Sequence, residues 1–286
     1  MVRYNTPLTH PTHQRIGFPQ QCWLAFFTTV LVALVCFGLG TIGSAIAAPE
    51  PTQLSDRALA QQAQRHQSQG DFNQAEADWN GLLNRYPDNP ALWSNRGNIR
   101  VSLGEFEKAI ADYDHAIALA PQEPDPYLNR GAAYEAQGQW HQAIADYNQV
   151  LELDPNDAAA YNNRGNAQMG LENWLAAIAD YQAAIDHKPD FAIARSNLAL
   201  ALFEQGDVAQ SLTQLRRLTR KYPVFADSRA ALTAVLWSQG QSGEAESNWV
   251  AVQGLDPRYQ DMQWVAQIRR WPPKMVTALE QFLAME

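Results

Sequence analysis

Prolines recur at a fixed spacing along most of this chain. The interval is 34 residues, and it holds through Pro87, Pro121, Pro155, Pro189, Pro223 and Pro257. A catalytic motif normally occurs once, whereas a fixed period of about 20–50 residues indicates a structural unit that is stacked. The spacing therefore predicts six abutting units, at residues 56–89, 90–123, 124–157, 158–191, 192–225 and 226–259.

Each unit has the pattern of two helices joined by a short turn. In unit 124–157, Tyr127, Gly131 and Tyr134 fall three and four residues apart, which places them on one helical face. Gly138 then interrupts the pattern and suits the left-handed conformation that ends a helix. Pro155 ends the second helix, because the residue before a proline avoids helical geometry.

The turn of unit 158–191 departs from this pattern. Glu172 stands where the other units have glycine, and Gly170 lies two residues earlier. We therefore expect a different turn in this unit, with Asn173 as the left-handed residue.

The residue columns resemble the tetratricopeptide repeat. An aromatic residue at position 4 of the unit, glycine at 8 and 15, alanine at 20, tyrosine at 24 and proline at 32 match that family best in units 90–123 and 124–157. The resemblance implies an all-α fold, a right-handed α-solenoid of six helix-turn-helix units. We assign Gly97, Gly131 and Gly165 to close helix packing. Such repeats serve many tasks, so the resemblance specifies fold much more than function.

Charged residues form two more columns in three units. Position 7, where the family usually has leucine, holds Arg96, Arg130 and Arg164. Position 23, on the second helix of the same units, holds Asp112, Asp146 and Asp180. Because the two substitutions occur together, we predict an Arg–Asp bridge within each unit, with a structural role.

Asparagine recurs at position 6, which faces the concave groove in this family. The column holds Asn95, Asn129, Asn163 and Asn197, and Asn98, Asn162 and Asn166 lie beside it. A carboxamide both donates and accepts, which suits an extended peptide backbone. First helices about 10 Å apart would let four such rungs hold about nine to twelve residues. The alternative is that asparagine is simply common at this position in the family.

Apolar residues toward the C-terminal end of the groove are candidate anchors for the same ligand. Neutral hydrogen bonds contribute only about 1 kcal/mol each, so a ladder of amides needs such anchors. The candidates are Met169, Leu200, Phe203 and Trp237. The alternative is that some of them pack beneath a C-terminal cap.

The chain beyond Tyr259 leaves the repeat pattern. Residues 260–270 and 274–284 have the pattern of two helices, separated by Trp271, Pro272 and Pro273. A solenoid needs an end unit that covers its last apolar face, so residues 260–286 are predicted to be a capping helix pair. The tail RRWPPKMVTALEQFL is similar to the ends of some repeat proteins of cyanobacteria and the thylakoid lumen.

The N-terminal segment has the features of an export signal. Arg3 and Arg15 precede an uncharged stretch that contains the apolar run 23–39, and Ala45-Ile46-Ala47 fits a signal-peptidase site. Residues 1–47 are therefore expected to be a cleaved signal peptide or a membrane anchor through residues 22–46, followed by a linker at 48–55. In either case the repeats are exported to the periplasm or thylakoid lumen.

Composition limits the classes of partner and activity. Without the two leader arginines, 19 basic residues face 30 acidic ones, which argues against nucleic acid as a partner. No phosphate loop, nucleophile elbow or zinc spacing occurs, and the histidines fall at unrelated unit positions, so we expect no enzyme, cofactor or metal.

These features together favour a monomeric, non-catalytic scaffold that binds a protein or peptide segment in its concave groove and assists the assembly of a membrane complex. The alternative is a structural tether at the membrane that uses its convex or terminal surfaces and leaves the groove idle.

Overall fold

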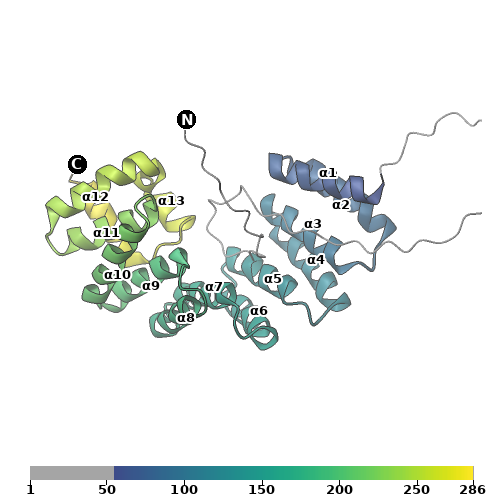
Figure 1. The fold of residues 1–286 in the computed structure, drawn as a ribbon, viewed down its shortest axis with the longest axis horizontal. Helices are drawn as coiled ribbons and strands as arrows, with labels where there is room; N and C mark the ends of the chain where they lie inside the picture. Colours follow the sequence, from purple (N-terminus) through teal and green to yellow (C-terminus); the bar gives the residue numbers. More distant parts are fainter. Residues whose placement is uncertain (1–54, 286) are drawn as a thin grey trace, which may run out of the picture. The chain divides into compact units, whose positions relative to one another are not determined.

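The computed structural model describes residues 55–285, and within that range it contains α-helices and one short 3-10 helix but no strand (Figure 1). This confirms the predicted all-helical solenoid of helix-turn-helix repeats. The predicted leader, residues 1–47, its expected cleavage site and most of the predicted linker lie outside the described residues. Among residues 55–285, no helix is both long enough and apolar enough to cross a bilayer.

The chain divides into two compact units, and the described part of the first ends at Leu119. It contains two helix hairpins, α1 with α2 and α3 with α4, and α2 also packs on α3. The helices are α1 (Asp56–Gln69), α2 (Phe72–Arg85), α3 (Pro90–Ser102) and α4 (Phe106–Leu119).

The second unit, from Ala120 onward, contains four more hairpins and the C-terminal helices. Each helix from α5 to α12 packs on the next one in the chain. The helices are α5 (Pro124–Ala136), α6 (Trp140–Leu153), α7 (Ala158–Gly170), α8 (Trp174–His187), α9 (Ala192–Gln205), α10 (Val208–Lys221), α11 (Ala226–Ser238), α12 (Ser242–Leu255), the 3-10 helix η1 (Pro257–Gln260), α13 (Met262–Gln267) and α14 (Pro273–Leu283).

We number the hairpins repeat 1 to repeat 6 and call the first helix of each the A helix and the second the B helix. The A helices begin at residues 56, 90, 124, 158, 192 and 226, which is the same 34-residue interval as the prolines. The B helices of repeats 1, 3, 4, 5 and 6 end at a residue with extended φ directly before the repeating proline. The proline thus sets the length of each repeat.

The carbonyl group of the proline also fixes the start of the next A helix. Trp93 at position 4 donates its indole N–H to the Pro87 carbonyl oxygen, 2.6 Å away. Tyr127, Arg195 and Arg229 occupy the same position in later repeats, and each donates to the proline carbonyl six residues earlier. Aromatic and arginine side chains therefore perform one structural task at this position.

Glycine at position 8 lets the A and B helices approach closely. A Cβ atom placed on Gly97, Gly131 or Gly165 would lie 2.7 Å from the ring of Tyr113, Tyr147 or Tyr181 respectively. Because a real Cβ does not tolerate such a distance, these tyrosines pack directly on the backbone of the A helix.

The turn of repeat 4 differs from the sequence expectation. Glu172 itself adopts the left-handed conformation, with φ 60°, whereas Asn173 has φ −83°. The turn is therefore like that of repeat 3, where Gly138 has φ 71°. The neighbouring Gly170 has a separate packing reason, since a Cβ there would lie 2.7 Å from the Trp140 ring.

The C-terminal segment also differs from the expectation of two helices of similar length. The first is reduced to η1 and the six-residue α13, and Arg270 has φ 53°. The helix stops early because Arg269, Arg270 and Trp271 turn toward carboxylates on α5 and α11, to which their side chains donate hydrogen bonds.

Candidate ligand-binding surface

Three arginine–aspartate pairs fix the A helix to the B helix in repeats 2, 3 and 4. In repeat 2, Arg96 donates from Nε and Nη2 to the two carboxylate oxygens of Asp112, over 2.9 and 2.6 Å. Arg130 with Asp146, and Arg164 with Asp180, have the same two-pronged geometry. The structure thus places an Arg–Asp pair within each of these three repeats.

Two of these arginines, Arg96 and Arg164, also contact the preceding repeat, which the sequence did not indicate. Arg96 Nη1 donates to the Asn80 side chain, and Arg164 Nη1 donates to Asn148, each over 2.7 Å. Each guanidinium also lies over the aromatic ring at position 4, Trp93 or Tyr161. With all these contacts in place, the arginines are positioning residues and not ligand contacts.

The buried tyrosines direct their hydroxyl groups toward polar residues of the A helices. Tyr113 donates to Asn98 over 2.7 Å, and Tyr181 donates to Asn166 over 2.9 Å. Burial raises the pKa of both tyrosines, so they remain neutral donors. The oxygens of Asn98 and Asn166 are consequently occupied, and only their N–H groups face away from these bonds.

The asparagines of repeats 4 and 5 form a buried network. Asn162 and Asn163 are 0% and 1% exposed, and Asn197 is 7% exposed. Asn162 donates to Asn163, and Asn197 donates to both Asn162 and Asn166, over 3.0–3.1 Å. These amides bind one another and join α7 to α9.

Two asparagines of the position-6 column differ from these. Asn95 on α3 and Asn129 on α5 are partly exposed, and neither carboxamide takes part in a hydrogen bond with any residue that the structure describes. Both retain a donor and an acceptor for a ligand. We use the term A-helix face for the surface of the A helices on which position 6 lies. The first compact unit has its own A-helix face, which carries Asn95, and the second compact unit has another, which carries Asn129.

Three of the four predicted apolar anchors contact the C-terminal helix. Leu200 and Phe203 are 1% and 8% exposed and belong to one buried cluster with α14. The Trp237 ring meets the Phe282 ring edge-on, with centroids 5.5 Å apart. Met169 is partly buried against the cluster around Tyr181. Leu200, Phe203 and Trp237 therefore pack beneath the C-terminal helix, which is the alternative to ligand binding that the sequence left open.

The C-terminal segment lies against the A helices of repeats 5 and 6, where α14 packs on α9 and α11. Glu204 on α9 accepts a hydrogen bond from the backbone N–H of Met275, 2.9 Å away, in the first turn of α14. The Lys274 ammonium group donates to the Glu204 carbonyl oxygen over 2.5 Å. A negative charge at a helix N-terminus is favourable, so Glu204 acts as a cap supplied from another element.

Two buried carboxylates hold the preceding loop. Arg270 donates to Glu135 on α5 over 2.8 Å, and Tyr147 donates to the other oxygen of Glu135. Asp227 on α11 accepts from Ser196, Tyr259, Arg269 and Trp271. The loop before α14 is therefore attached to repeats 3 and 6 by ion pairs and hydrogen bonds.

The electrostatics of the three carboxylates differ. Burial raises the pKa of Glu135 and of Glu204. Burial would also raise the pKa of Asp227, but the charge of Arg269 and the bonds from Tyr259 and Ser196 outweigh it and lower that pKa. Asp227 is thus a fixed anion at the base of the C-terminal segment.

These three acids were not predicted from the sequence. Each departs from the repeat columns, as Glu135 at position 12 and Asp227 at position 2 do, so periodicity alone could not find them. The available signal was the pair Arg269-Arg270, which needs two anions if it is to be buried. Among residues 55–285, no group of three histidines, cysteines or acids is placed to hold a metal ion.

Two family models match the chain. One, described as TPR repeat, matches residues 97–138 and 133–172. The other, described as Tetratricopeptide repeat, matches residues 162–224 and 196–259. Their matches together extend from residue 97 to residue 259, which is more than half of the 286 residues. The fold and these matches define a helical repeat protein built from paired helices. The chain belongs to the tetratricopeptide repeat family.

Solved structures show the same fold. A tetratricopeptide repeat protein from Parabacteroides merdae is similar with a TM-score of 0.62 and 19% identity, over 80% of this chain and 93% of that one. TTC0263 of Thermus thermophilus gives 0.54 and 19%, over 64% and 99% of the two chains. MamA from Desulfovibrio magneticus gives 0.53 and 20%, over 58% and 93%. No curated protein sequence matches the chain significantly.

Proposed function

We propose that this protein is a non-catalytic scaffold that binds an extended segment of another protein on its A-helix face. The observation that carries the proposal is the state of Asn95 and Asn129. Both side chains are partly exposed at equivalent positions, and neither amide is used within the described structure. A peptide backbone offers the N–H and C=O groups that complete such amides, whatever its side chains are.

The energetics require more than two amides. Each neutral hydrogen bond contributes about 1 kcal/mol, and micromolar affinity needs about 8 kcal/mol. The remaining N–H groups of Asn98 and Asn166 can add polar contacts, and apolar contacts must supply the rest. A scaffold of this kind binds with moderate affinity, and the flanking side chains determine which segment it prefers.

The C-terminal segment of the chain supports this use of the A-helix face. On α9 and α11 that face already holds a polypeptide, through a carboxylate bonded to a backbone N–H and through apolar packing of Phe282. The same kinds of contact are the ones that a partner segment would make elsewhere on the face. We assign a structural role to the buried network of Asn162, Asn163 and Asn197, because its amides bind one another.

We also propose a location for the scaffold. We infer from the leader sequence that the repeats are exported, and that the scaffold assists the assembly of a membrane complex from the periplasmic or lumenal side. The competing function is a tether that uses the outer surfaces of the B helices or the ends of the array.

A peptide selection separates the two functions. Displayed random peptides of about twelve residues are selected on the full-length chain, and their affinities are compared with Asn95→Ala/Asn129→Ala. Loss of two hydrogen bonds should weaken selected peptides about tenfold or more. The matched control is Asn84→Ala/Asn156→Ala, which removes two exposed amides elsewhere and should change affinity less than about twofold. Equal affinity for the wild type and Asn95→Ala/Asn129→Ala, with unchanged helix content, contradicts the proposed face and favours the outer surfaces.

A further inference from the structure

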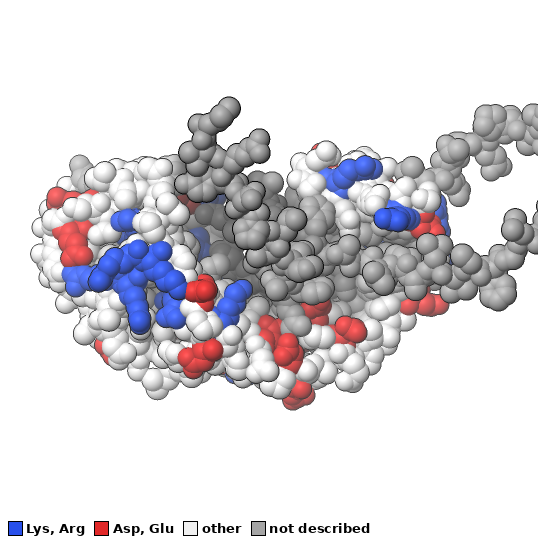
Figure 2. All heavy atoms as spheres, viewed as in Figure 1, with Lys and Arg blue, Asp and Glu red and all other residues white. Residues whose placement is uncertain are grey.

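The hairpin of repeat 5 carries a basic surface on an otherwise acidic protein. The whole chain has a formal net charge of −9, yet Figure 2 shows a group of lysine and arginine side chains over the region where α9 and α10 lie. We call this the α10 basic surface and define it by Arg195 on α9 and by Arg216, Arg217, Arg220 and Lys221 on α10.

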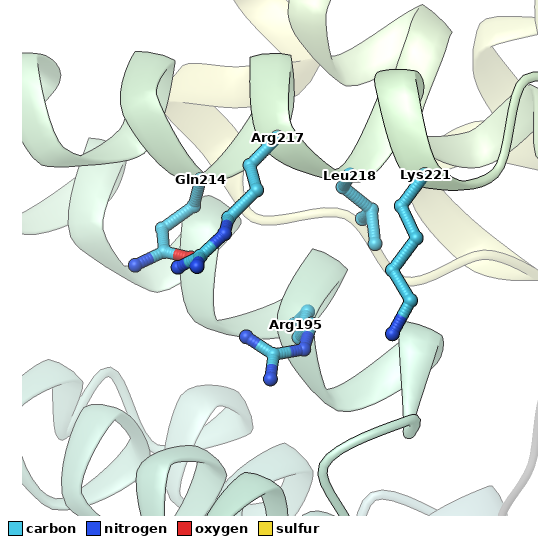
Figure 3. Close-up of a pocket in the computed structure, with 5 residues that line it drawn as sticks. All are labelled: Arg195, Gln214, Arg217, Leu218 and Lys221. Atoms are coloured by element: carbon cyan, nitrogen blue, oxygen red, sulfur yellow. The ribbon is translucent and has the colours of Figure 1, made fainter.

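A pocket lies within this surface. Its lining consists of Arg195 from α9 and of Gln214, Arg217, Leu218 and Lys221 from α10 (Figure 3). Leu218 is only 2% exposed, so the floor is apolar and the lining side chains above it are polar or cationic. A pocket of this composition suits an anionic group on a short side chain.

Comparison with the other repeats shows what is special about repeat 5. Repeats 2, 3 and 4 have an aromatic residue at position 4 and an aspartate at position 23 that pairs with an arginine at position 7. In repeat 5, Arg195 occupies position 4, Leu198 position 7 and Gln214 position 23. Repeat 5 therefore carries its arginine at position 4 instead of position 7, and it lacks the aspartate at position 23.

Repeat 6 provides an internal comparison. Arg229 also occupies position 4, and it donates to the Pro223 carbonyl oxygen as Arg195 does to Pro189. Its guanidinium Nη1 also donates a hydrogen bond to the Asn248 side-chain oxygen, 3.2 Å away. The two positions that hold Arg217 and Lys221 in repeat 5 hold Ala251 and Leu255 here. An arginine at position 4 alone is thus a structural feature, and the basic pocket is confined to repeat 5.

Two of the cations of the α10 basic surface are already paired and two are not. Arg216 binds Glu244, and Lys221 binds Asp190. Arg217 and Arg220 are exposed, and neither has an ion pair or side-chain hydrogen bond with any residue between 55 and 285. Hydrogen bonding from Lys221 is the main cause that lowers the pKa of Asp190, so this acid stays ionised and its charge offsets that of Lys221. Within the described residues, the unpaired cations of the surface are therefore Arg217 and Arg220.

We propose that the α10 basic surface binds an acidic segment of a partner protein, with one carboxylate in the pocket of Arg195, Arg217 and Lys221 and a second on Arg220. Guanidinium groups match carboxylates with two parallel hydrogen bonds. The site lies on the A helix and B helix of repeat 5, separate from Asn95 and Asn129, so it stands whether or not the A-helix face binds a peptide.

A short acidic segment fits this surface better than an extended polyanion. Charges are screened beyond about 8 Å at physiological ionic strength, so a local cluster attracts a small anion despite the net charge of the whole. An anionic membrane or a nucleic acid covers a wider area and would also meet the acids Asp190 and Glu244, which lie against Lys221 and Arg216. Repulsion from these acids disfavours a broad anionic surface.

The test uses the full-length chain and a fluorescein-labelled peptide of eight consecutive glutamates, with binding followed by fluorescence anisotropy. The variant Arg217→Gln/Arg220→Gln should bind about five- to tenfold more weakly, since each exposed ion pair contributes up to about fivefold. The matched control Arg57→Gln/Arg65→Gln removes two exposed arginines from α1 and should bind within about twofold of the wild type.

A second variant tests the pocket itself. Arg195→Tyr restores the residue type that Tyr127 and Tyr161 have at this position, so it keeps the fold and removes one cation. It should weaken the peptide severalfold, whereas Arg229→Tyr in repeat 6 should not. If a variant and its matched control lose the same peptide affinity, the proposed site is wrong, because binding would then depend on net charge alone. A membrane surface is the alternative partner. It would be indicated if the chain bound phosphatidylglycerol vesicles more tightly than neutral vesicles, and if Arg217→Gln/Arg220→Gln lost this preference but kept peptide binding. That result would overturn the choice of an acidic protein segment.

Discussion

Glu172 adopts a backbone conformation that glycine adopts at the turn of each of the other five repeats. Its φ of 60° lies in the left-handed region, beside values of 71–98° at Gly70, Gly104, Gly138, Gly206 and Gly240. A residue with a Cβ atom pays roughly 1 kcal/mol for this conformation. The turn geometry is therefore imposed by the packing of α7 and α8, and it persists without the residue that favours it.

Replacing Glu172 with glycine should stabilise the protein. We expect the free energy of unfolding to rise by up to about 1 kcal/mol, because the strain is removed at a small cost in chain entropy. The change also removes a negative charge that raises the pKa of Glu204. Urea unfolding followed by circular dichroism measures the difference. Gly138→Ala, at the equivalent turn of repeat 3, is the control of opposite sign and should lose about 1 kcal/mol. A loss of stability in Glu172→Gly would show instead that the Glu172 side chain makes a net favourable contribution.

At the scale of single residues, the sequence predicts side-chain contacts between positions that recur with the period of the repeat. It does not predict contacts between residues that do not recur. The Arg–Asp pairs were predictable because the two columns change together within one unit, as at Arg164 and Asp180. The bond between Asn197 and Asn162 was not, since it joins residues 35 positions apart on different repeats. The burial of that network depends on how closely α7 and α9 approach, and no column records this distance.

At the scale of elements, α14 performs a task that the repeat pattern assigns to no helix. A cap was predictable, because an array must cover its last apolar face. Its placement was not, because it depends on Glu135, Glu204 and Asp227, which lie outside the columns. These acids direct the segment onto α9 and α11, so the residues predicted to bind a ligand, Phe203 and Trp237, bind this helix.

Removing the Glu204 cap should loosen α14. In Glu204→Ala the Met275 N–H loses its partner, at an expected cost of about 1 kcal/mol in the stability of this helix. Hydrogen exchange should become faster in residues 273–283 and stay unchanged in α5 to α8. Glu204→Gln is the matched control, because its amide oxygen can still accept the bond and its exchange should stay near that of the wild type. Equal exchange in Glu204→Ala and the wild type would mean that apolar packing of Leu279 and Phe282 alone holds α14.

At the scale of the whole molecule, the chain combines a basic, apolar N-terminal segment, which we predict to be a leader, with an acidic array. Arg3 and Arg15 are the only charged residues before Glu50, and a basic flank stays on the side of the membrane from which insertion starts. Both cysteines, Cys22 and Cys36, lie in the leader. The repeats therefore need no disulfide and can fold in an oxidising compartment as well as in a reducing one.

This arrangement predicts that the array is found across a membrane from its site of synthesis. We expect expression of the full chain in a bacterium to give either a soluble periplasmic product that begins at Ala48 or a membrane-bound product of full mass, with the repeats accessible to protease from the periplasm. Intact mass and N-terminal sequence of each fraction distinguish the two. Ala47→Leu, which places a large residue at the cleavage site, should shift a cleaved product to the membrane-bound form. A full-length product in the cytosol, with the repeats inaccessible from the periplasm, contradicts export, and the scaffold would then have to find its partner in the cytoplasm.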